Sequence, residues 1–515
     1  MATMIVYYAL SILTSYLLLW ATYQIFLHPL SKYPGPLVAK FSDIYSAFYS
    51  YKRRLHLTTW NNQRKYGPVV RQSPNKLVFS SATAVLDIYK NDRTTKPAAY
   101  MALGPGLTTY NVFSARDKHL HRARRQLIGQ ALTERSMRTF EPIMIEQVDI
   151  FCRNLLSQSQ SSTPANMSVQ TRRLGLNIAG LLAFGYDLRL QTSDDNRFME
   201  TVMDTGTFFS NLWLQFPAGR KLRIAFLMLS PLRKLREKYL GLMENMMTSR
   251  MSLPKDAKHD LYSFVAEALD AKSDGLRQSE LWGEANMFLS AAGGTVTTAL
   301  SATFFYLSRN QDAYKKLAHE IRSTFASSSE IHGTALAGCT FLRACIDEAM
   351  RLSPPAPGIL WRDLAPGDDS SQPFVVDGHV IPPNTVVGVN TYSLHHSEDY
   401  FPNAFAYRPE RWVSSSDEEK KISREAFAPF SVGSRGCAGK AMAYLESSLV
   451  LAKSLWYFDF ESASGELGEV GAGKVGLEEG RERKGEFQLY DTFSSSHDGP
   501  YLKFVVRSDN WKDLE

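Results

Sequence analysis

The chain has 515 residues, 44% of them hydrophobic and 21% charged, with 58 Lys and Arg against 52 Asp and Glu. These values are ordinary for globular proteins and argue against wholesale disorder, a collagen-like repeat or a multi-span transporter. The small basic excess includes no arginine-rich arm or lysine tract, so we expect no nucleic-acid partner. It better fits an anionic membrane surface or an acidic protein partner. The four cysteines have no spacing typical of a zinc site or a disulfide framework.

The N-terminal segment is apolar. No charged residue precedes Lys32, and the run from Ile5 to Phe26 is long enough to cross a hydrocarbon layer of ~30 Å. We therefore predict one transmembrane anchor over residues 1–27. The alternative is a cleaved signal peptide, but the run is longer than the apolar core of a signal and has no basic start.

The residues that follow predict the orientation of the chain. Positive charges occur at Lys32, Lys40 and residues 52–54. By the positive-inside rule they place the rest of the chain on the cytosolic side, so we expect the sequon at residues 166–168 to stay unglycosylated. Residues 28–36 end in Tyr-Pro-Gly-Pro, which predicts a stiff hinge between the anchor and the body.

The body is predicted to be mainly helical, with a few short strands and no internal repeat. A low-complexity insert from Gly465 to Gly485, rich in Gly, Glu, Lys and Arg, is predicted to be a solvated loop. Strand signals occur in four stretches, Val69 to Phe79, Phe374 to Ile381 around Asp377-Gly378, Val386 to Val389, and Tyr501 to Val506.

A long apolar helix is predicted from Leu281 to Leu307, interrupted by the pair Gly293-Gly294. Each glycine costs roughly 0.8–1 kcal/mol relative to alanine in a helix interior, which favours a functional reason for the pair. Two adjacent glycines would open a groove in the helix wall, and Thr297 lies one turn away on the same face.

A second helix carries Glu348 and Arg351 and is stopped by Ser-Pro-Pro from residue 353. The two charged residues are three apart, so they lie on one face and can form a bidentate pair. A lone pair with this spacing is usually a solvated surface pair.

The clearest chemistry lies between Phe430 and Gly439. Gly433, Gly436 and Gly439 indicate that the backbone passes close to something flat or bulky, and Cys437 falls at the start of a predicted helix. A helix N-terminus lowers the pKa of a thiol, and the resulting thiolate suits a soft metal. The alternative, an inert buried cysteine, does not explain the spacing of the surrounding residues.

This spacing, F-x-x-G-x-R-x-C-x-G, resembles the heme-binding loop of the cytochrome P-450 family of heme-thiolate monooxygenases. The resemblance implies that the cofactor is heme b and that Cys437 is the axial ligand of its iron. It also implies that Arg435 pairs with a heme propionate and that Phe430 packs beside the sulfur. Gly433 and Gly439 complete the heme-binding motif.

Other segments resemble the family in the same order. Glu348 and Arg351 match its E-x-x-R helix, and Arg411 matches its P-E-R motif, so the three are expected to form a structural cluster behind the heme loop. By the same resemblance His121 and Arg125 correspond to a W-x-x-x-R helix that binds a propionate. This basic segment could equally be a membrane-facing or solvated face. Arg124 is expected instead to face the reductase, and Arg362 is another candidate propionate partner.

The glycine pair also matches the family. Residues 293–298 fit its pattern (A/G)-G-x-(D/E)-T-(T/S) at five of six positions, which implies that Gly293, Gly294 and Thr297 form the oxygen-handling part of a catalytic site. Val296 stands where the family has an acid that relays protons. Protons would then come through water or another hydroxyl such as that of Thr298.

The implied fold is mainly α with a small β lobe, the cytochrome P-450 fold with one N-terminal transmembrane helix. Residues 37–515 would form a single catalytic domain. The anchor, the hinge and the stretch from Arg408 to Trp412 resemble fungal microsomal members of secondary metabolism. We therefore expect a single-pass protein of the endoplasmic reticulum membrane whose catalytic domain faces the cytosol.

The expected reaction is oxidation of a lipophilic small molecule, a terpenoid or polyketide intermediate, with O2. The sequence shows no nucleotide-binding glycine fingerprint, so electrons are expected from outside the chain. The family resemblance implies that they come from an NADPH-dependent diflavin reductase at the same membrane. Two alternatives remain open. One is a heme-thiolate isomerase, dehydratase or peroxide-using enzyme, and the other is a non-enzymatic heme-binding membrane protein. The candidate pocket segments are Tyr100 to Phe113, Phe208 to Phe216, Leu289 to Thr297 and Pro357 to Leu360.

Overall fold

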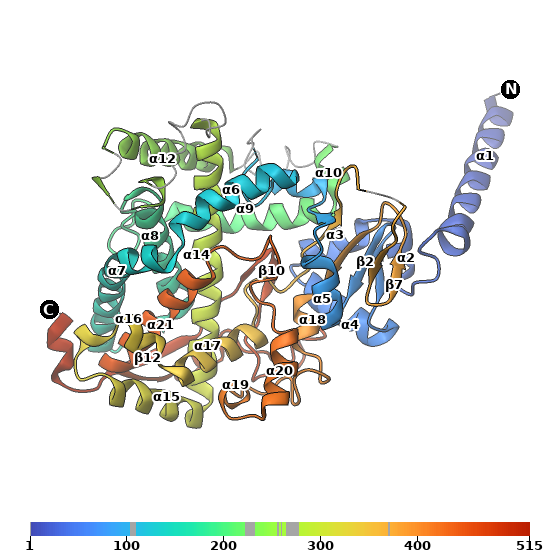
Figure 1. Ribbon diagram of the computed structural model, residues 1–515. Helices are drawn as coiled ribbons and strands as arrows, with labels where there is room; N and C mark the ends of the chain where they lie inside the picture. The colour runs from blue at the N-terminus through green and yellow to red at the C-terminus, as the bar shows by residue number, and fades with distance from the viewer. Residues whose placement is uncertain are drawn as a thin grey trace.

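Helices dominate the structure, and the strands form several small sheets, as the sequence predicted (Figure 1). The computed structural model describes residues 2–103, 110–221, 232–254, 257–258, 260–263, 278–368 and 371–514. The α-helices of the first half are α1 Ala2–Thr22, α2 Leu37–Phe41, α3 Ile44–Tyr51, α4 Leu55–Tyr66, α5 Ala82–Tyr89, α6 Lys118–Ala131, α7 Glu134–Gln160, α8 Met167–Phe184, α9 Phe198–Gln215, α10 Pro217–Lys221 and α12 Arg233–Met251.

The second half continues the helical body. Its α-helices are α14 Gln278–Arg309, α15 Gln311–Thr324, α16 Gly333–Ala337, α17 Thr340–Leu352, α18 Thr391–His395, α19 Glu410–Val413, α20 Asp417–Ala426 and α21 Lys440–Tyr457. Short turns of other helix types are the π-helix η1 Tyr23–Leu27 and the 3-10 helices η2 Ala98–Leu103, η5 Ser328–Glu330, η6 Gly465–Glu469 and η7 Asp509–Leu514.

The four predicted strand stretches are confirmed. The main sheet has the order β1-β2-β8, in which β2 pairs antiparallel with β1 and parallel with β8. Asp377-Gly378, both at positive φ, form the turn of the β6–β7 hairpin. The strands are β1 Val70–Ser73, β2 Lys76–Phe79, β3 Thr94–Thr95, β4 Ala165–Asn166, β5 Asp363–Leu364, β6 Phe374–Val376, β7 His379–Ile381, β8 Val386–Val389, β9 Phe458–Ser462, β10 Tyr490–Thr492, β11 Ser494–Ser496 and β12 Tyr501–Val506.

The long helix α14 runs through the centre of the molecule and packs against α8, α17 and α21 (Figure 1). The expectation that Gly293-Gly294 interrupts this helix is wrong, because α14 is continuous from end to end. A β-carbon on Gly293 would lie 2.3 Å from Cδ2 of Leu176 on α8. The first glycine therefore allows close packing of two core helices.

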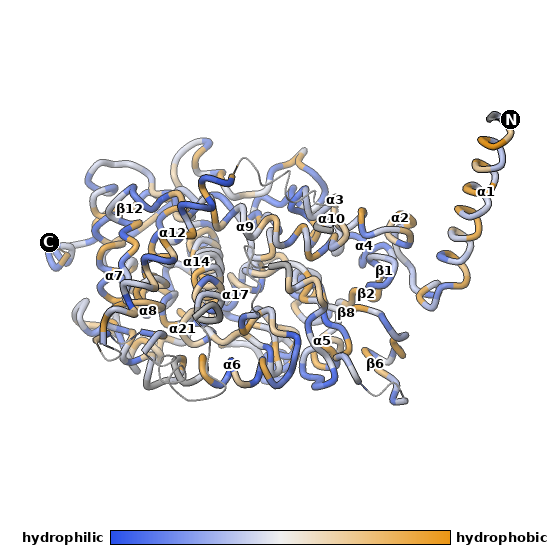
Figure 2. Tube along the Cα trace, turned by 90° about the horizontal axis from the view of Figure 1, so that it is seen from above, coloured by the Kyte–Doolittle hydropathy of each residue, from blue (hydrophilic) through white to orange (hydrophobic). Residues whose placement is uncertain are grey.

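α1 stands clear of the body in both views, and Figure 2 shows hydrophobic residues along its length. Residues Thr3–Leu27 are apolar and long enough to cross a membrane, and none of the most apolar stretch is buried. The connection to the body is fixed by Arg71 of β1, which donates to the backbone carbonyl and the side-chain Oε1 of Gln24, each at 2.8 Å. Arg71 also donates its N–H to the carbonyl of Pro34.

The insert from Gly465 to Gly485 is only partly the solvated loop that was expected. Its middle is exposed, but Arg481 is buried and donates to the carbonyl of Leu489. Glu478 forms an ion pair with Arg54. The loop is therefore folded back onto the body at its C-terminal end.

Candidate functional site

The loop that carries Cys437 lies between α20 and α21. Its backbone is held by hydrogen bonds within the motif, since Cys437 N–H donates to the carbonyl of Phe430 (2.8 Å) and Gly436 N–H to that of Gly433 (3.0 Å). Gly433 has φ +77°, and a β-carbon there would lie 2.1 Å from the carbonyl oxygen of Tyr89. Only glycine fits at position 433, because any side chain there would collide with the Tyr89 backbone. The close backbone approach predicted for this one of the three glycines is therefore explained.

The thiol of Cys437 is exposed on one side, two residues before Gly439, the N-cap of α21. Burial by the chain around its other side raises the pKa of this thiol, although the Gly439 N–H, Arg125 and Lys440 act in the opposite direction. The helix start therefore acts on this pKa in the expected direction, but burial outweighs it. A coordinated metal deprotonates a thiol outright, so ligation would hold the thiolate.

Four predicted cofactor-binding residues surround the same place, namely His121 and Arg125 of α6, Arg362 after α17, and Arg435 of the cysteine loop. A fifth group, Lys96, was missed by the sequence analysis. Burial first, and then repulsion among these groups, lowers the pKa of His121 to about 3 and that of Lys96 well below its usual range. Burial and Arg362 likewise lower the pKa of Arg435 to about 10.

Backbone oxygens hold these groups in place. Lys96 Nζ donates to the carbonyl of Phe113 (2.6 Å), Arg362 to that of Trp361 (2.9 Å), and Arg435 to that of Ala115 (2.7 Å). Throughout the ranges that the structure describes, none of the five forms an ion pair with a carboxylate. The cluster is therefore complementary to an anionic ligand with two or more charges.

Arg124 is not part of this cluster. Its side chain is 2% exposed and forms an ion pair with Glu284 of α14, with Nη1 and Oε1 2.7 Å apart. The expectation that it faces a reductase is wrong, because its side chain is buried in a pair that joins α6 to the central helix.

These residues fit an iron porphyrin. A soft thiol beside several buried cations suits a metal that brings its own equatorial ligands and carries two carboxylates. Among the described residues, no group of three or more His, Cys, Asp or Glu side chains converges to hold a bare metal ion. The site is therefore that of a heme-thiolate protein.

The residues expected on the oxygen side of the site lie on α14, which packs against α21. Thr297 is 1% exposed, and its Oγ1 donates to the carbonyl of Gly293 (2.8 Å). Thr298 donates to the carbonyls of Gly294 (3.1 Å) and Ser495 (3.3 Å). Val296 is buried in the apolar core. The described contacts do not join Thr297 directly to Cys437.

A pocket of about 370 Å³, which includes its open mouth, reaches α14 from the surface. Gly293, Gly294 and Ser290 of α14 form one wall. Arg172 of α8 and Asp204 of α9, which form an ion pair, also line this pocket. Of the other predicted pocket segments, Tyr100 to Phe113 falls partly outside the described residues.

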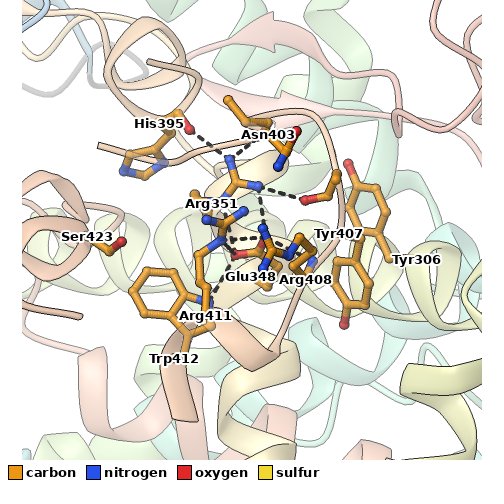
Figure 3. A network of polar contacts seen from close by, with 12 residues as sticks. Tyr306, Glu348, Arg351, His395, Asn403, Tyr407, Arg408, Arg411, Trp412 and Ser423 are labelled. Atoms are coloured by element: carbon orange, nitrogen blue, oxygen red, sulfur yellow. Dashed lines mark hydrogen bonds and ion pairs between the residues drawn. The ribbon is translucent and has the colours of Figure 1, made fainter. Parts of the chain in front are cut away.

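The predicted cluster of Glu348, Arg351 and Arg411 is present and fully buried (Figure 3). Glu348 accepts two hydrogen bonds from Arg351 (2.9 and 3.0 Å) and two from Arg411 Nε (both 3.1 Å). Sequence reasoning missed two further donors, the Trp412 indole (3.0 Å) and the Arg408 backbone N–H (3.1 Å). Burial alone would raise the pKa of Glu348, but the two arginines and the Arg408 N–H hold it below its usual value.

Arg351 extends the network to the segment before α19. It donates to the carbonyls of His395 (2.8 Å), Ala404 (2.7 Å) and Ala406 (3.2 Å) (Figure 3). The cluster therefore fixes α17, α18 and the chain leading to α19 relative to one another.

Comparison with known proteins agrees with this site. A family profile described as Cytochrome P450 matches residues 31–469. The chain belongs to the cytochrome P450 family, is a monooxygenase and uses heme b as its cofactor.

Several relatives match almost end to end. The chain is 31% identical to the cytochrome P450 monooxygenase AKT7 of Alternaria alternata, with 96% of each chain covered. It is 32% identical to the cytochrome P450 monooxygenase apf7 of Gibberella fujikuroi, with 95% of each covered. It is also 32% identical to the cytochrome P450 monooxygenase poxM of Penicillium oxalicum, covering 97% of this chain and 95% of that one.

Proposed function

We propose that this chain is a membrane-anchored monooxygenase that oxidises a lipophilic intermediate of fungal secondary metabolism, a terpenoid or a polyketide. The observation that carries the assignment is the convergence of five cationic or imidazole side chains, three of them buried, around the loop of Cys437. Heme bound to a thiolate supplies the oxidation of unactivated carbon with O2. Electrons come from an NADPH-dependent diflavin reductase at the endoplasmic reticulum membrane.

The chain's own residues have distinct roles in this proposal. Cys437 binds the iron, while Arg435, Arg362 and Lys96 neutralise the propionates. Thr297 holds a proton at Oγ1 on the oxygen side. Packed aromatic rings near Lys96 exclude water, with the ring centres of Phe113 and Phe493 5.5 Å apart and those of Tyr100 and Phe113 5.7 Å apart.

The metal assignment is tested by the spectrum of the reduced carbon monoxide complex. We expect Cys437→His to abolish the thiolate-type band while the variant still binds heme. Cys339→Ser, which changes a cysteine elsewhere in the buried core, is the matched control and should keep the band. Persistence of the thiolate-type band in Cys437→His would exclude this cysteine as the ligand.

The reaction class is tested by comparing metabolites from the source organism with and without the gene by mass spectrometry. We expect the lost product to be its precursor plus one oxygen or minus two hydrogens. The alternative of an isomerase or dehydratase is favoured only by Val296, because valine stands at the position where the family has a proton-relaying acid. A lost product that differs from its precursor by no oxidation would support that alternative.

The anchor is tested by deletion. Removing residues 1–21 should release the protein from microsomes if this segment spans the membrane. Release of the full-length chain by alkaline carbonate would contradict a spanning segment.

A further inference from the structure

Glu284, in the N-terminal part of α14, makes a contact in addition to its ion pair with Arg124. Both oxygens of its carboxylate accept the backbone N–H of Val112, Oε1 at 2.8 Å and Oε2 at 3.0 Å. Oε1 also accepts the hydrogen bond of Arg124 Nη1 at 2.7 Å. The Glu284 side chain is 12% exposed, and hydrogen bonds to an ionised acceptor are stronger than those between neutral groups. Glu284 therefore ties the central helix to the segment before α6 as well as to α6 itself.

Val112 belongs to a turn, residues 111–115, that is held together by hydrogen bonds of its own. Ser114 N–H donates to the side-chain oxygen of Asn111 at 2.8 Å and to its carbonyl at 3.2 Å. Ala115 N–H donates to the same carbonyl at 2.9 Å, and Asn111 N–H donates to Ser114 Oγ at 3.1 Å. Because the turn is bonded internally, a displacement at Val112 also moves Phe113 and Ala115.

The carbonyls of this turn hold two members of the cationic cluster. Lys96 Nζ donates to the carbonyl of Phe113 at 2.6 Å and lies 3.2 Å from the centre of its ring. Arg435 donates to the carbonyl of Ala115 at 2.7 Å and to that of the next residue, Arg116, at 3.3 Å. Arg116 in turn donates to the carbonyl of Lys96 at 3.0 Å. The positions of Lys96 and Arg435, which lie far apart in the sequence, therefore depend on the same turn.

A further contact between α14 and the turn is longer. Asn111 Nδ2 lies 3.4 Å from the carbonyl oxygen of Gly283. This distance is beyond the usual range of N–H···O hydrogen bonds, about 2.7–3.2 Å, whereas both contacts of Glu284 with Val112 lie within it. The carboxylate is therefore the stronger of these two attachments of the turn to the central helix.

We propose that Glu284 is a positioning residue for the cationic partners of the heme propionates. By holding the turn of residues 111–115, it keeps Lys96 and Arg435 in the places from which they pair with the two carboxylates of the cofactor. The inference rests on the proposed function, in which these two side chains neutralise the propionates. A role confined to joining α6 and α14 would need only the ion pair of Glu284 with Arg124.

The geometry of the carboxylate provides a sharp variant. Both oxygens lie within hydrogen-bond distance of the Val112 nitrogen, so the amide of Glu284→Gln places an NH2 group against this N–H in either orientation. The variant keeps the size of the side chain but releases the turn. Arg124→Met is the matched control, because it breaks the same ion pair and leaves the carboxylate on the turn. The double variant lacks both charges, so it separates release of the turn from a charge imbalance.

The first test is resonance Raman spectroscopy of the full-length ferric holoenzyme, read at the bending band of the propionates. We expect this band to shift in Glu284→Gln and to stay at the wild-type position in Arg124→Met. The double variant should show the shift of Glu284→Gln. Equal shifts in the two single variants, or a wild-type band in the double variant, would overturn the proposal.

The second test is the rate of heme transfer to excess apomyoglobin. Glu284→Gln should speed the transfer by about two- to tenfold, the factor that the loss of one hydrogen bond gives, while Arg124→Met should stay close to the wild type. The effect of Glu284→Gln should be smaller in a Lys96→Met background, because one of the two positioned cations is then absent. Fully additive effects of Glu284→Gln and Lys96→Met would contradict an action of Glu284 through the turn.

The two proposals fail in different ways. If Cys437 does not bind the iron, the wild-type carbon monoxide complex lacks the thiolate-type spectrum. If Lys96 does not pair with the propionates, their band stays unchanged in Lys96→Met. If only the role of Glu284 is wrong, the thiolate-type spectrum is normal and the band shifts in Lys96→Met but not in Glu284→Gln.

Discussion

Replacing Glu348 with Gln should cost a large part of the stability of the catalytic domain. The carboxylate lies between the guanidinium groups of Arg351 and Arg411 and is 0% exposed. An amide removes the negative charge and leaves two buried cations without a counter-ion, which costs about 3–5 kcal/mol for a buried pair. Against a typical total of about 5–15 kcal/mol, the folded-to-unfolded ratio should fall at least roughly a hundredfold.

The assay is urea denaturation followed by tryptophan fluorescence, with the fraction of chains giving the thiolate-type spectrum measured in parallel. The pKa of Glu348 is lowered in the folded state, so its contribution is present above the unfolded pKa of about 4.3 and is lost as the pH falls further. The difference between variant and wild type should therefore shrink below about pH 4.

Glu425→Gln, on the exposed face of α20, is the matched control and should change stability by less than about 0.5 kcal/mol. The reasoning is refuted if Glu348→Gln has the denaturation midpoint of the wild type. A variant with full heme content, normal stability and slow turnover would instead place Glu348 in catalysis.

Three further outcomes can be checked. Gly433→Ala should prevent heme retention, because the new β-carbon would lie 2.1 Å from the Tyr89 carbonyl at φ +77°, whereas Gly241→Ala, which meets nothing within 4 Å, should bind heme normally. Lys96→Met should speed the transfer of heme to excess apomyoglobin, since one of the buried cations is removed; an unchanged rate would show that Lys96 does not contact the propionates. Asp491→Asn should raise stability at pH 7 by about 2–3 kcal/mol, because burial raises the pKa of Asp491 to about 6 and stability is lost as the pH rises through that range. The gain should vanish near pH 4, and thermal denaturation showing the same difference at both pH values would contradict it.

Local patterns predicted the elements of the fold well. The Asp377-Gly378 turn and the short apolar stretches identified β6, β7 and β8, because hairpin residues act on their immediate neighbours. The failures depend on contacts between distant segments. Gly293 was expected to interrupt α14, but its role is set by Leu176 of α8, whose position no local pattern reveals.

The same distinction applies to the candidate site. The cysteine motif and the cluster around Glu348 were predicted because a family resemblance gives their residues directly. Lys96 was missed because it belongs to no motif and reaches the site only through tertiary folding; its neighbour Thr95 contacts Arg435, 340 positions later. Arg124 was placed wrongly because its partner Glu284 lies on another helix.

The attachment of Arg71 to Gln24 has a practical consequence for anyone preparing a soluble form of this enzyme. Arg71 is 0% exposed, and two of its three side-chain hydrogen bonds reach Gln24 in the π-helical turn η1 that follows α1. A truncation that begins at residue 28 would leave the buried guanidinium of Arg71 without two of its three hydrogen-bond acceptors, so it should yield less folded protein than one that begins at residue 22. Expression trials that shorten the N-terminus one residue at a time should show a sharp drop in yield when Gln24 is lost.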